Sequence, residues 1–407
     1  MPDGPTRLAG DDANVAQTLA RLRGHIAAIQ SSVLASTRMA MPRAQIAPQD
    51  VPFDESHTAE GPLFSRGRDH GLLPRVGHFE AHCARAPDAG LLAMLAMDEQ
   101  FAGVDFSRAL YIDTETTGLS RGAGTVAFLI GCGYWHGLRF VTELLFVPDY
   151  GQERTALLRL AKLASEASSY VSFNGKAFDM PLLRTRYVMT GLPPLPDLPH
   201  MDLLSVARRV HKRGDGVRRG VRLQQLEREV LGLVREGDIP SSEVSAVYNH
   251  YVRSGDAEGL RAVADHNEQD VLSMVALLAL YGEPLTETRL SASDLSGVAR
   301  VMQKRGFGDE AALLADRAVA TQANAHTLRA RAEIAKARHQ RDAALCDFER
   351  AHAEESDPRL RLELAKLYEH HRKDIARALE VAREGVAETV CQSAHRIARL
   401  TRKSRAS

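Results

Sequence analysis

Four acidic residues in the middle of the chain have side chains suited to holding metal ions. Asp113 and Glu115 alternate in YIDTETTGL, Asp179 follows in SFNGKAFDMP, and Asp270 lies in DHNEQDVLSM. Carboxylate oxygens are hard ligands, which suit Mg²⁺ or Mn²⁺. Two such ions roughly 3.5 to 4 Å apart stabilise the attacking and leaving oxygens when a phosphodiester bond is hydrolysed. Metal-dependent phosphodiester hydrolysis is therefore the leading hypothesis.

A strand must position the first two acids. Residues 110–112 form a short apolar run that predicts a strand, and the alternating Asp113 and Glu115 would then project from the same face. Two carboxylates on one face repel each other, and a bound cation would neutralise them. The predicted strand therefore makes a metal ion between these two residues favourable.

Helices are expected to carry the other two acids. Residues 170–173 predict a second strand, and a helix should begin near Asp179 and Pro181, since proline is favoured early in a helix. A helical pattern of apolar residues places His266 and Asp270 on one face, four residues apart. That spacing can put a proton acceptor beside a metal ligand, so His266 is a candidate general base.

Each motif taken alone also fits a purely structural role. The threonines of DTETT could satisfy backbone groups in a turn, and Asp179 could cap a helix. His266 and Asp270 could form a solvated pair on a helix surface. Asp202, in HMDLL, is a helix cap more readily than a fifth ligand. Only the combination of the three motifs favours a metal site.

The order of the motifs, DxE, then NxxxFDxP, then HxxxD, resembles the three exonuclease motifs of the DEDD superfamily, whose fold is ribonuclease-H-like. Residues 60–282 look more narrowly like the YprB-type exonuclease domain, through LYIDTETTGLSRGAGTVAFLIGCGYW, VSFNGKAFDMPLLRTR, HMDLL and DHNEQDVLSMVALL. The resemblance implies that Asp113, Glu115, Asp179 and Asp270 hold the two Mg²⁺ or Mn²⁺ ions, with His266 in the place of the base. Superfamily members with a histidine base usually carry it five residues before the last aspartate. The four-residue spacing here is that of the tyrosine-base branch.

Further residues are candidates for contact with the nucleic acid. Thr116, Asn174 and Phe178 lie beside the acidic motifs, although an Asn-Gly turn and a core phenylalanine would explain the last two equally well. A basic run lies between the second and third motifs, where it could contact phosphates or be an ordinary solvated surface. Its members are Arg208, Arg209, Lys212, Arg213, Arg218, Arg219 and Arg222.

One motif is judged a coincidence. Gly122, Gly124 and Ala127 match the GxGxxA fingerprint of dinucleotide-binding folds, which must open a helix directly after a strand. Here the glycines lead into VAFLIGCGYW, which predicts a strand. A hairpin is the better explanation of these glycines.

Composition limits the remaining function classes. The chain has 407 residues, 44% of them hydrophobic and 26% charged, which predicts a globular protein of two or three domains. Its 52 basic and 52 acidic residues balance, so only a local patch could attract nucleic acid. The four cysteines are widely spaced and show no zinc or disulfide pattern. With neither a membrane span nor a signal peptide in the pattern, a cytoplasmic location is expected.

The chain is expected to divide into three parts. Residues 1–62 predict an amphipathic helix at 15–33 and a proline-containing linker. Residues 63–285 should form the α/β ribonuclease-H-like domain, which the resemblance implies to be a mixed five-stranded sheet flanked by helices. Residues 286–407 should form an all-α domain of helical repeats, because Ala299, Ala332 and Ala365 recur every 33 residues. The spacing resembles tetratricopeptide repeats without their signature Trp and Gly, and such repeats commonly bind a protein partner.

The resemblance implies hydrolysis of DNA or RNA from a 3′ end. Two alternatives remain open from the residues alone: a structure-specific endonuclease that uses the same site, and a scaffold protein whose acidic site is vestigial. The retention of all four acids argues against the scaffold.

Overall fold

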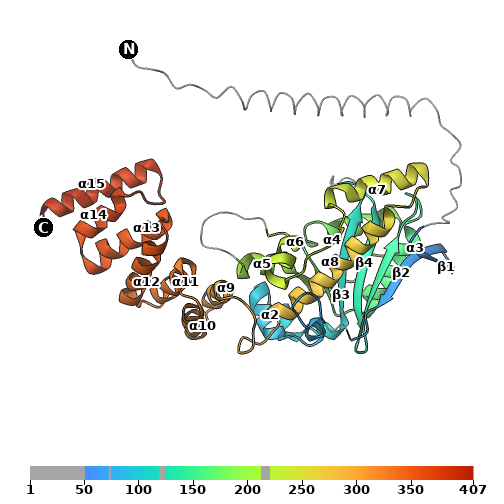
Figure 1. Cartoon of the computed structure of the whole chain (residues 1–407), viewed down its shortest axis with the longest axis horizontal. Coiled ribbons are helices and arrows are strands. Elements are labelled where there is room, and N and C mark those ends of the chain that lie inside the picture. The colour runs from blue at the N-terminus through green and yellow to red at the C-terminus, as the bar shows by residue number, and fades with distance from the viewer. Residues whose placement is uncertain (1–50, 73–74, 119–123, 212–220, 407) are drawn as a thin grey trace, which may run out of the picture. The chain divides into compact units, whose positions relative to one another are not determined.

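The computed structural model describes residues 51–72, 75–118, 124–211 and 221–406, which all belong to one compact unit, Asp50–Ser407 (Figure 1). The predicted amphipathic helix at residues 15–33 lies outside these residues. Four members of the basic run, Lys212, Arg213, Arg218 and Arg219, also lie outside them.

A single mixed sheet of seven strands forms the centre of the first part of this unit, in the order β1-β2-β5-β4-β3-β6-β7. Neighbouring strands run antiparallel from β1 to β3, whereas β6 and β7 join β3 in parallel. The strands are β1 (Asp54–Thr58), β2 (Gly61–Asp69), β3 (Ala109–Thr116), β4 (Ala127–His136), β5 (Arg139–Phe146), β6 (Ser169–Ser172) and β7 (His200–Asp202).

The predicted number of five strands is wrong, and the reason lies at one edge of the sheet. The hairpin of β1 and β2 pairs with β5 through β2, from Phe64 opposite Phe146 to Asp69 opposite Val141. It thereby covers a strand edge that would otherwise expose unpaired backbone groups. Strand β1 lies within the segment predicted as a linker, where an exposed, polar hairpin strand leaves no apolar alternation to detect.

Alternation along β3 assigns its side chains to the two faces of the sheet. Leu110 and Ile112 belong to an apolar cluster with helices α3 (Arg154–Glu166) and α4 (Asp179–Met189). Tyr111 points the other way, into a cluster with α8 (Leu260–Tyr281). Asp113 and Glu115 continue the alternation of Tyr111, so both acids lie on the α8 face, as the sequence predicts.

Helices and short turns complete this part. The α-helices not yet given are α2 (Ala89–Ala96), α5 (Leu203–Val210), α6 (Leu223–Leu226) and α7 (Ser241–Ser254). Three short 3₁₀ segments, η1 (Ala81–Arg85), η2 (Glu99–Gly103) and η3 (Phe106–Arg108), precede β3, and the π-helical turn η4 (Glu227–Leu231) follows α6. Ala127, the last residue of the GxGxxA match, begins strand β4, so the described end of the match, from Gly124, opens no helix; Gly122 lies outside the described residues.

The remainder of the chain is helical, as predicted. It contains α9 (Ala292–Lys304), α10 (Gly308–Thr321), α11 (Ala325–Ala337), α12 (Arg341–Glu354), α13 (Pro358–Leu367), η5 (Tyr368–Arg372), α14 (Ile375–Arg383) and α15 (Val390–Ala406). The repeating alanines Ala299, Ala332 and Ala365 are all fully buried, on α9, α11 and α13. Small residues at these positions let successive helices pack closely.

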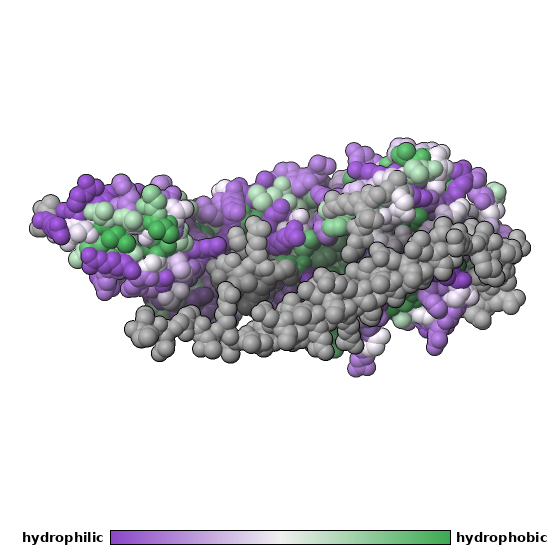
Figure 2. Space-filling model, turned by 90° about the horizontal axis from the view of Figure 1, so that it is seen from above, coloured by the Kyte–Doolittle hydropathy of each residue, from purple (hydrophilic) through white to green (hydrophobic). Residues whose placement is uncertain are grey.

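The first of these helices packs directly onto the sheet-containing part. One apolar cluster includes residues of α2, α5 and α8 together with α9 and α10. A Cβ atom on Gly297 of α9 would lie 2.0 Å from the Val210 carbonyl oxygen, so glycine is needed at this close approach. Within the described ranges, no helix is both long and apolar enough to span a membrane. The coloured residues on the face shown in Figure 2 are mainly hydrophilic.

Candidate metal centre

The four predicted carboxylates come from three segments that the fold brings together. Asp113 and Glu115 lie on β3, Asp179 is the first residue of α4, and Asp270 lies on α8. The backbone N–H of Thr114 donates to Asp179 Oδ1 at 3.1 Å, and its hydroxyl donates to the same oxygen at 2.5 Å. These two bonds tie the start of α4 to β3.

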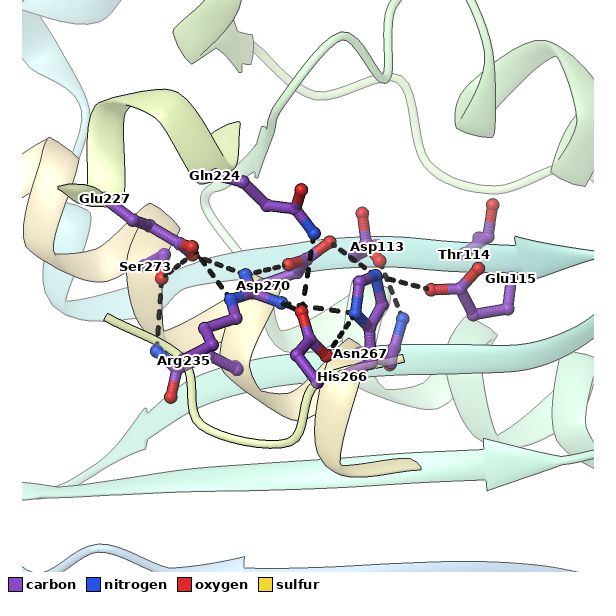
Figure 3. Close-up of polar contacts among 12 residues, drawn as sticks. Asp113, Thr114, Glu115, Gln224, Glu227, Arg235, His266, Asn267, Asp270 and Ser273 are labelled. Carbon is purple, nitrogen blue, oxygen red and sulfur yellow. Dashed lines mark hydrogen bonds and ion pairs between the residues drawn. The ribbon is translucent and has the colours of Figure 1, made fainter. Parts of the chain in front are cut away.

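His266 points into the same cluster (Figure 3). Its Nε2 lies 4.0 Å from Glu115 Oε1 and 3.9 Å from Asp270 Oδ2, and its side chain is only 3% exposed. Potential ligand atoms of Glu115, His266 and Asp270 all lie within 4.8 Å of one another. The third motif is therefore a buried part of the site and not a solvated surface pair.

Asn267, which no sequence motif singles out, lies on α8 and points toward Asp113 of β3. It is fully buried, and its Nδ2 donates to Asp113 Oδ2 at 2.7 Å. Gly131 of β4 pairs with Asp113 across the sheet, and a Cβ atom there would lie 2.1 Å from Asn267 Oδ1. The missing side chain at Gly131 thus makes room for the amide that holds Asp113.

We expect Gly131→Ala to destabilise the protein by about 1 to 3 kcal/mol, the usual cost of overpacking. It should also reduce activity, because Asn267 must withdraw from Asp113. Gly67→Ala is a matched control, since a Cβ atom on this strand glycine meets nothing within 4 Å. Urea denaturation compares their free energies of unfolding, and equal values for the two variants would contradict the packing argument.

A second group of residues missed from the sequence surrounds Asp270. Arg235 donates through Nη2 to Asp270 Oδ1, and through Nε to Glu227 Oε2 at 2.8 Å. Glu227 is 1% exposed and also accepts a hydrogen bond from the Ser273 hydroxyl at 2.5 Å. Asp238 Oδ1 contacts His266 Nδ1 at 2.7 Å. The spacing of Glu227, Arg235 and Asp238 matches no metal or catalytic motif, so the single sequence gave no signal for them.

Burial and mutual repulsion disturb the ionisation of the four acids. Burial, and then the charges of Asp270, Asp179 and Glu115, raise the pKa of Asp113 well above its usual range. Burial, followed by Asp270 and Asp179, raises the pKa of Glu115 to about 8. Burial raises the pKa of Asp179 to about 6, although the bonds from Thr114 oppose this. Burial likewise raises the pKa of Asp270, and Arg235 opposes the shift.

This site fits a hard divalent cation. Four oxygen-donating carboxylates converge in a desolvated space where their charges repel one another, and a bound cation would remove that repulsion. Arg235 balances part of the charge, through its ion pair with Asp270 and through its charge near Asp113. Glu115, His266 and Asp270, whose potential ligand atoms lie within 4.8 Å of one another, form the acidic cluster that could bind a metal ion.

The raised pKa values predict how the stability of the metal-free protein depends on pH. In the folded chain, Glu115 and Asp179 keep their protons to higher pH than in the unfolded chain, where both acids have their ordinary pKa near 4. The free energy of unfolding of the metal-free protein should therefore fall as pH rises from about 4 to about 8. We expect a loss on the order of 1 to 3 kcal/mol across this range. Mg²⁺ should abolish the loss, because it binds the ionised acids. Denaturation in chelator and in Mg²⁺ checks this, and a stabilisation by Mg²⁺ that does not grow with pH would contradict it.

The other predicted residues lie around the site with different contacts. Asp202 caps α5 and accepts from the backbone N–H groups of Asn174 (2.8 Å) and Lys176 (3.3 Å), so its role as a helix cap is confirmed. Asn174 has a left-handed backbone, with φ of 70°. Phe178, directly before Asp179, is 48% exposed.

The described members of the basic run differ among themselves. Arg208 and Arg222 are exposed on either side of residues 212–220. Arg209 instead donates to the Leu95 carbonyl oxygen at 3.0 Å, which joins α5 to α2. Thr116 donates its hydroxyl to the Gly118 carbonyl oxygen at 3.0 Å, a local bond in the turn after β3.

Comparisons with known proteins agree with this fold. A family model described as RNase_H superfamily matches residues 110–281, the span that carries all four carboxylates. The chain is 30% identical over 321 residues to the uncharacterized protein YprB of Bacillus subtilis (strain 168), covering 74% of this chain and 76% of that protein. It is also similar to the family B DNA polymerase of Pyrobaculum calidifontis, with 14% identity and a TM-score of 0.33, over 56% of this chain and 29% of the polymerase chain. The predicted ribonuclease-H-like fold is confirmed, and the chain belongs to the YprB family, with an RNase H superfamily domain at residues 110–281.

Proposed function

We propose that this protein is a divalent-metal-dependent nuclease that hydrolyses phosphodiester bonds of DNA or RNA, acting as a 3′–5′ exonuclease. The observation that carries the proposal is that Asp113, Glu115, Asp179 and Asp270, from three separate segments, meet in one partly buried cluster. Glu115 and Asp270 both lie beside His266, and Thr114, between Asp113 and Glu115, bonds to Asp179. Isolated buried carboxylates are costly, so a cluster of four needs a function that requires cations.

Two Mg²⁺ or Mn²⁺ ions, when bound, would supply the chemistry of water activation and charge stabilisation at the scissile phosphate. The chain itself would provide the four carboxylates that fix the ions and a group that accepts a proton. His266 Nε2 faces Glu115 and Asp270 at about the distance that leaves room for one water molecule between them. His266 is therefore the proposed base.

The proposal also assigns the residues that would bind the nucleic acid. The exposed ring of Phe178 lies next to Asp179 in sequence, where it could stack on a base. Asn174, Thr116 and the basic run from Arg208 to Arg222, apart from Arg209, would contact the backbone or the terminal nucleotide. We also propose that the nuclease domain ends at residue 285. The helices of residues 286–407 would bind a protein partner.

End-labelled substrates test the proposed reaction. Single-stranded DNA and RNA labelled at the 3′ or the 5′ end are incubated with Mg²⁺, with Mn²⁺ and with chelator. A 3′–5′ exonuclease releases the 3′ label first, as a mononucleotide, and leaves a circular single strand intact. Cleavage of the circle would indicate an endonuclease with the same site. No hydrolysis of any substrate with either ion would leave the scaffold alternative.

A further inference from the structure

The segment that links η4 to α7 contacts two site residues of α8, Asp270 and His266. Gly232 starts the segment with a left-handed backbone, and a Cβ atom there would lie 2.0 Å from ring atoms of His78. The backbone N–H of Leu233 returns to the Glu227 carbonyl oxygen at 2.8 Å. The chain is thereby turned so that Arg235 and Asp238 both reach α8.

Asp238 has a fixed orientation because its two oxygens face different partners. Oδ2 accepts from Arg235 Nη1 at 3.2 Å and from Gln224 Nε2 at 3.4 Å. Oδ1 contacts His266 Nδ1 at 2.7 Å. Arg235 is itself held by Glu227, which is almost fully buried, so the carboxylate of Asp238 cannot easily rotate.

This arrangement determines which nitrogen of His266 carries the proton. A carboxylate only accepts, so its 2.7 Å contact requires a proton on Nδ1. The guanidinium Nη1 of Arg235 lies 3.3 Å from the same nitrogen, but a guanidinium only donates and the shorter contact to Asp238 prevails. Nε2 is then left with its lone pair directed at Glu115 and Asp270 (Figure 3).

We propose that Asp238 is a positioning residue that holds His266 in the tautomer able to accept a proton at Nε2, and that Arg235 and Gln224 fix its orientation. This inference rests on the proposed function, in which His266 is the base. Carboxylate partners commonly fix the tautomer of a working histidine in this way.

The contacts of Asp238 predict an unusual order of variant effects. In Asp238→Asn, the amide oxygen should stay with the donors Arg235 and Gln224, which turns the NH₂ group toward His266 Nδ1. That nitrogen must then accept, and the proton moves to Nε2, where it blocks the base. Asp238→Ala imposes no tautomer. Asparagine should therefore be more damaging than alanine, whereas a residue with only a structural role would show the reverse order.

Turnover and tautomer are measured on the full-length protein with Mg²⁺. We expect Asp238→Asn to lose on the order of 10² to 10⁴ in kcat with KM little changed, and Asp238→Ala to lose less. Nitrogen NMR spectra of ¹⁵N-histidine-labelled protein should show the His266 proton on Nδ1 in wild type and on Nε2 in Asp238→Asn. The signal is assigned by its loss in His266→Asn.

Asp256→Asn is the matched control, because Asp256 pairs with His250 at 3.3 Å on an exposed surface. It should change neither turnover nor the His266 signal. Turnover in Asp238→Asn at or above that of Asp238→Ala, or a proton that remains on Nδ1 in Asp238→Asn, would overturn the inference. If wild type hydrolyses nothing, the proposed function fails, and the spectra alone decide whether Asp238 sets the tautomer.

Discussion

Asp113→Asn should abolish hydrolysis while the metal-free protein becomes more stable. The change removes a proposed metal ligand with almost no change in side-chain volume. Activity should therefore fall by more than the roughly 10- to 100-fold loss that follows mutation of a residue that only orients a metal ligand. It also removes an acid whose own pKa is raised in the folded protein by burial and by the charges of Asp270, Asp179 and Glu115, so folding near neutral pH no longer has to protonate that acid or bury its charge. The metal-free free energy of unfolding near neutral pH should therefore rise, by about 1 kcal/mol or more.

Asp265→Asn is the control for the change in charge. Asp265 also lies on α8, but it is 55% exposed and pairs with Arg66 at 2.9 Å. Removing its charge should leave hydrolysis unchanged. Near-wild-type turnover of Asp113→Asn in Mg²⁺ would show that Asp113 holds no metal ion needed for the reaction.

His266→Ala should lose on the order of 10² to 10⁴ in rate, the usual contribution of a general base. Mn²⁺ affinity, measured by titration calorimetry, should change little, because His266 serves the water and not the ions.

His266→Asn separates the role of the base from that of packing. Its amide N–H can replace the Nδ1–H contact to Asp238, but it has no atom in the place of Nε2. It should therefore fold better than the alanine variant and be equally inactive. A large loss of Mn²⁺ affinity in both variants would make His266 a metal ligand, and wild-type rates in both would make it only a helical neighbour of Asp270.

The sequence alone was sufficient to predict the elements that carry the motifs. A strand at 109–116, a helix from Asp179 and a helix through His266 and Asp270 all follow from apolar periodicity and proline position. The four carboxylates could be chosen because their type and order resemble a family pattern. The helical C-terminal part could be predicted because close helix packing demands small residues at fixed intervals, such as Ala299, Ala332 and Ala365.

What could not be predicted depends on contacts between distant segments. In the sequence, Asn267 resembles any other polar residue of a helix. Its role becomes visible only in the fold, which packs Gly131 of β4 against its side chain. Arg235 and Asp238 have no sequence periodicity with the motifs they support, since a turn in the chain brings them to α8. The β1–β2 hairpin was missed because β1 is an exposed, polar edge strand and β2 buries only the adjacent Leu63 and Phe64, so neither strand shows the apolar alternation that identifies inner strands.

Reactivation after metal removal is the most direct test of the claim that four carboxylates hold the ions needed for hydrolysis. Protein stripped with chelator is titrated with Mn²⁺, and nucleotide release from single-stranded DNA and RNA is recorded for wild type and Asp113→Asn. We expect the stripped wild type to be inactive and to recover full activity with Mn²⁺, whereas Asp113→Asn does not recover. Activity that persists in chelator, or equal recovery of the two proteins, would contradict the account.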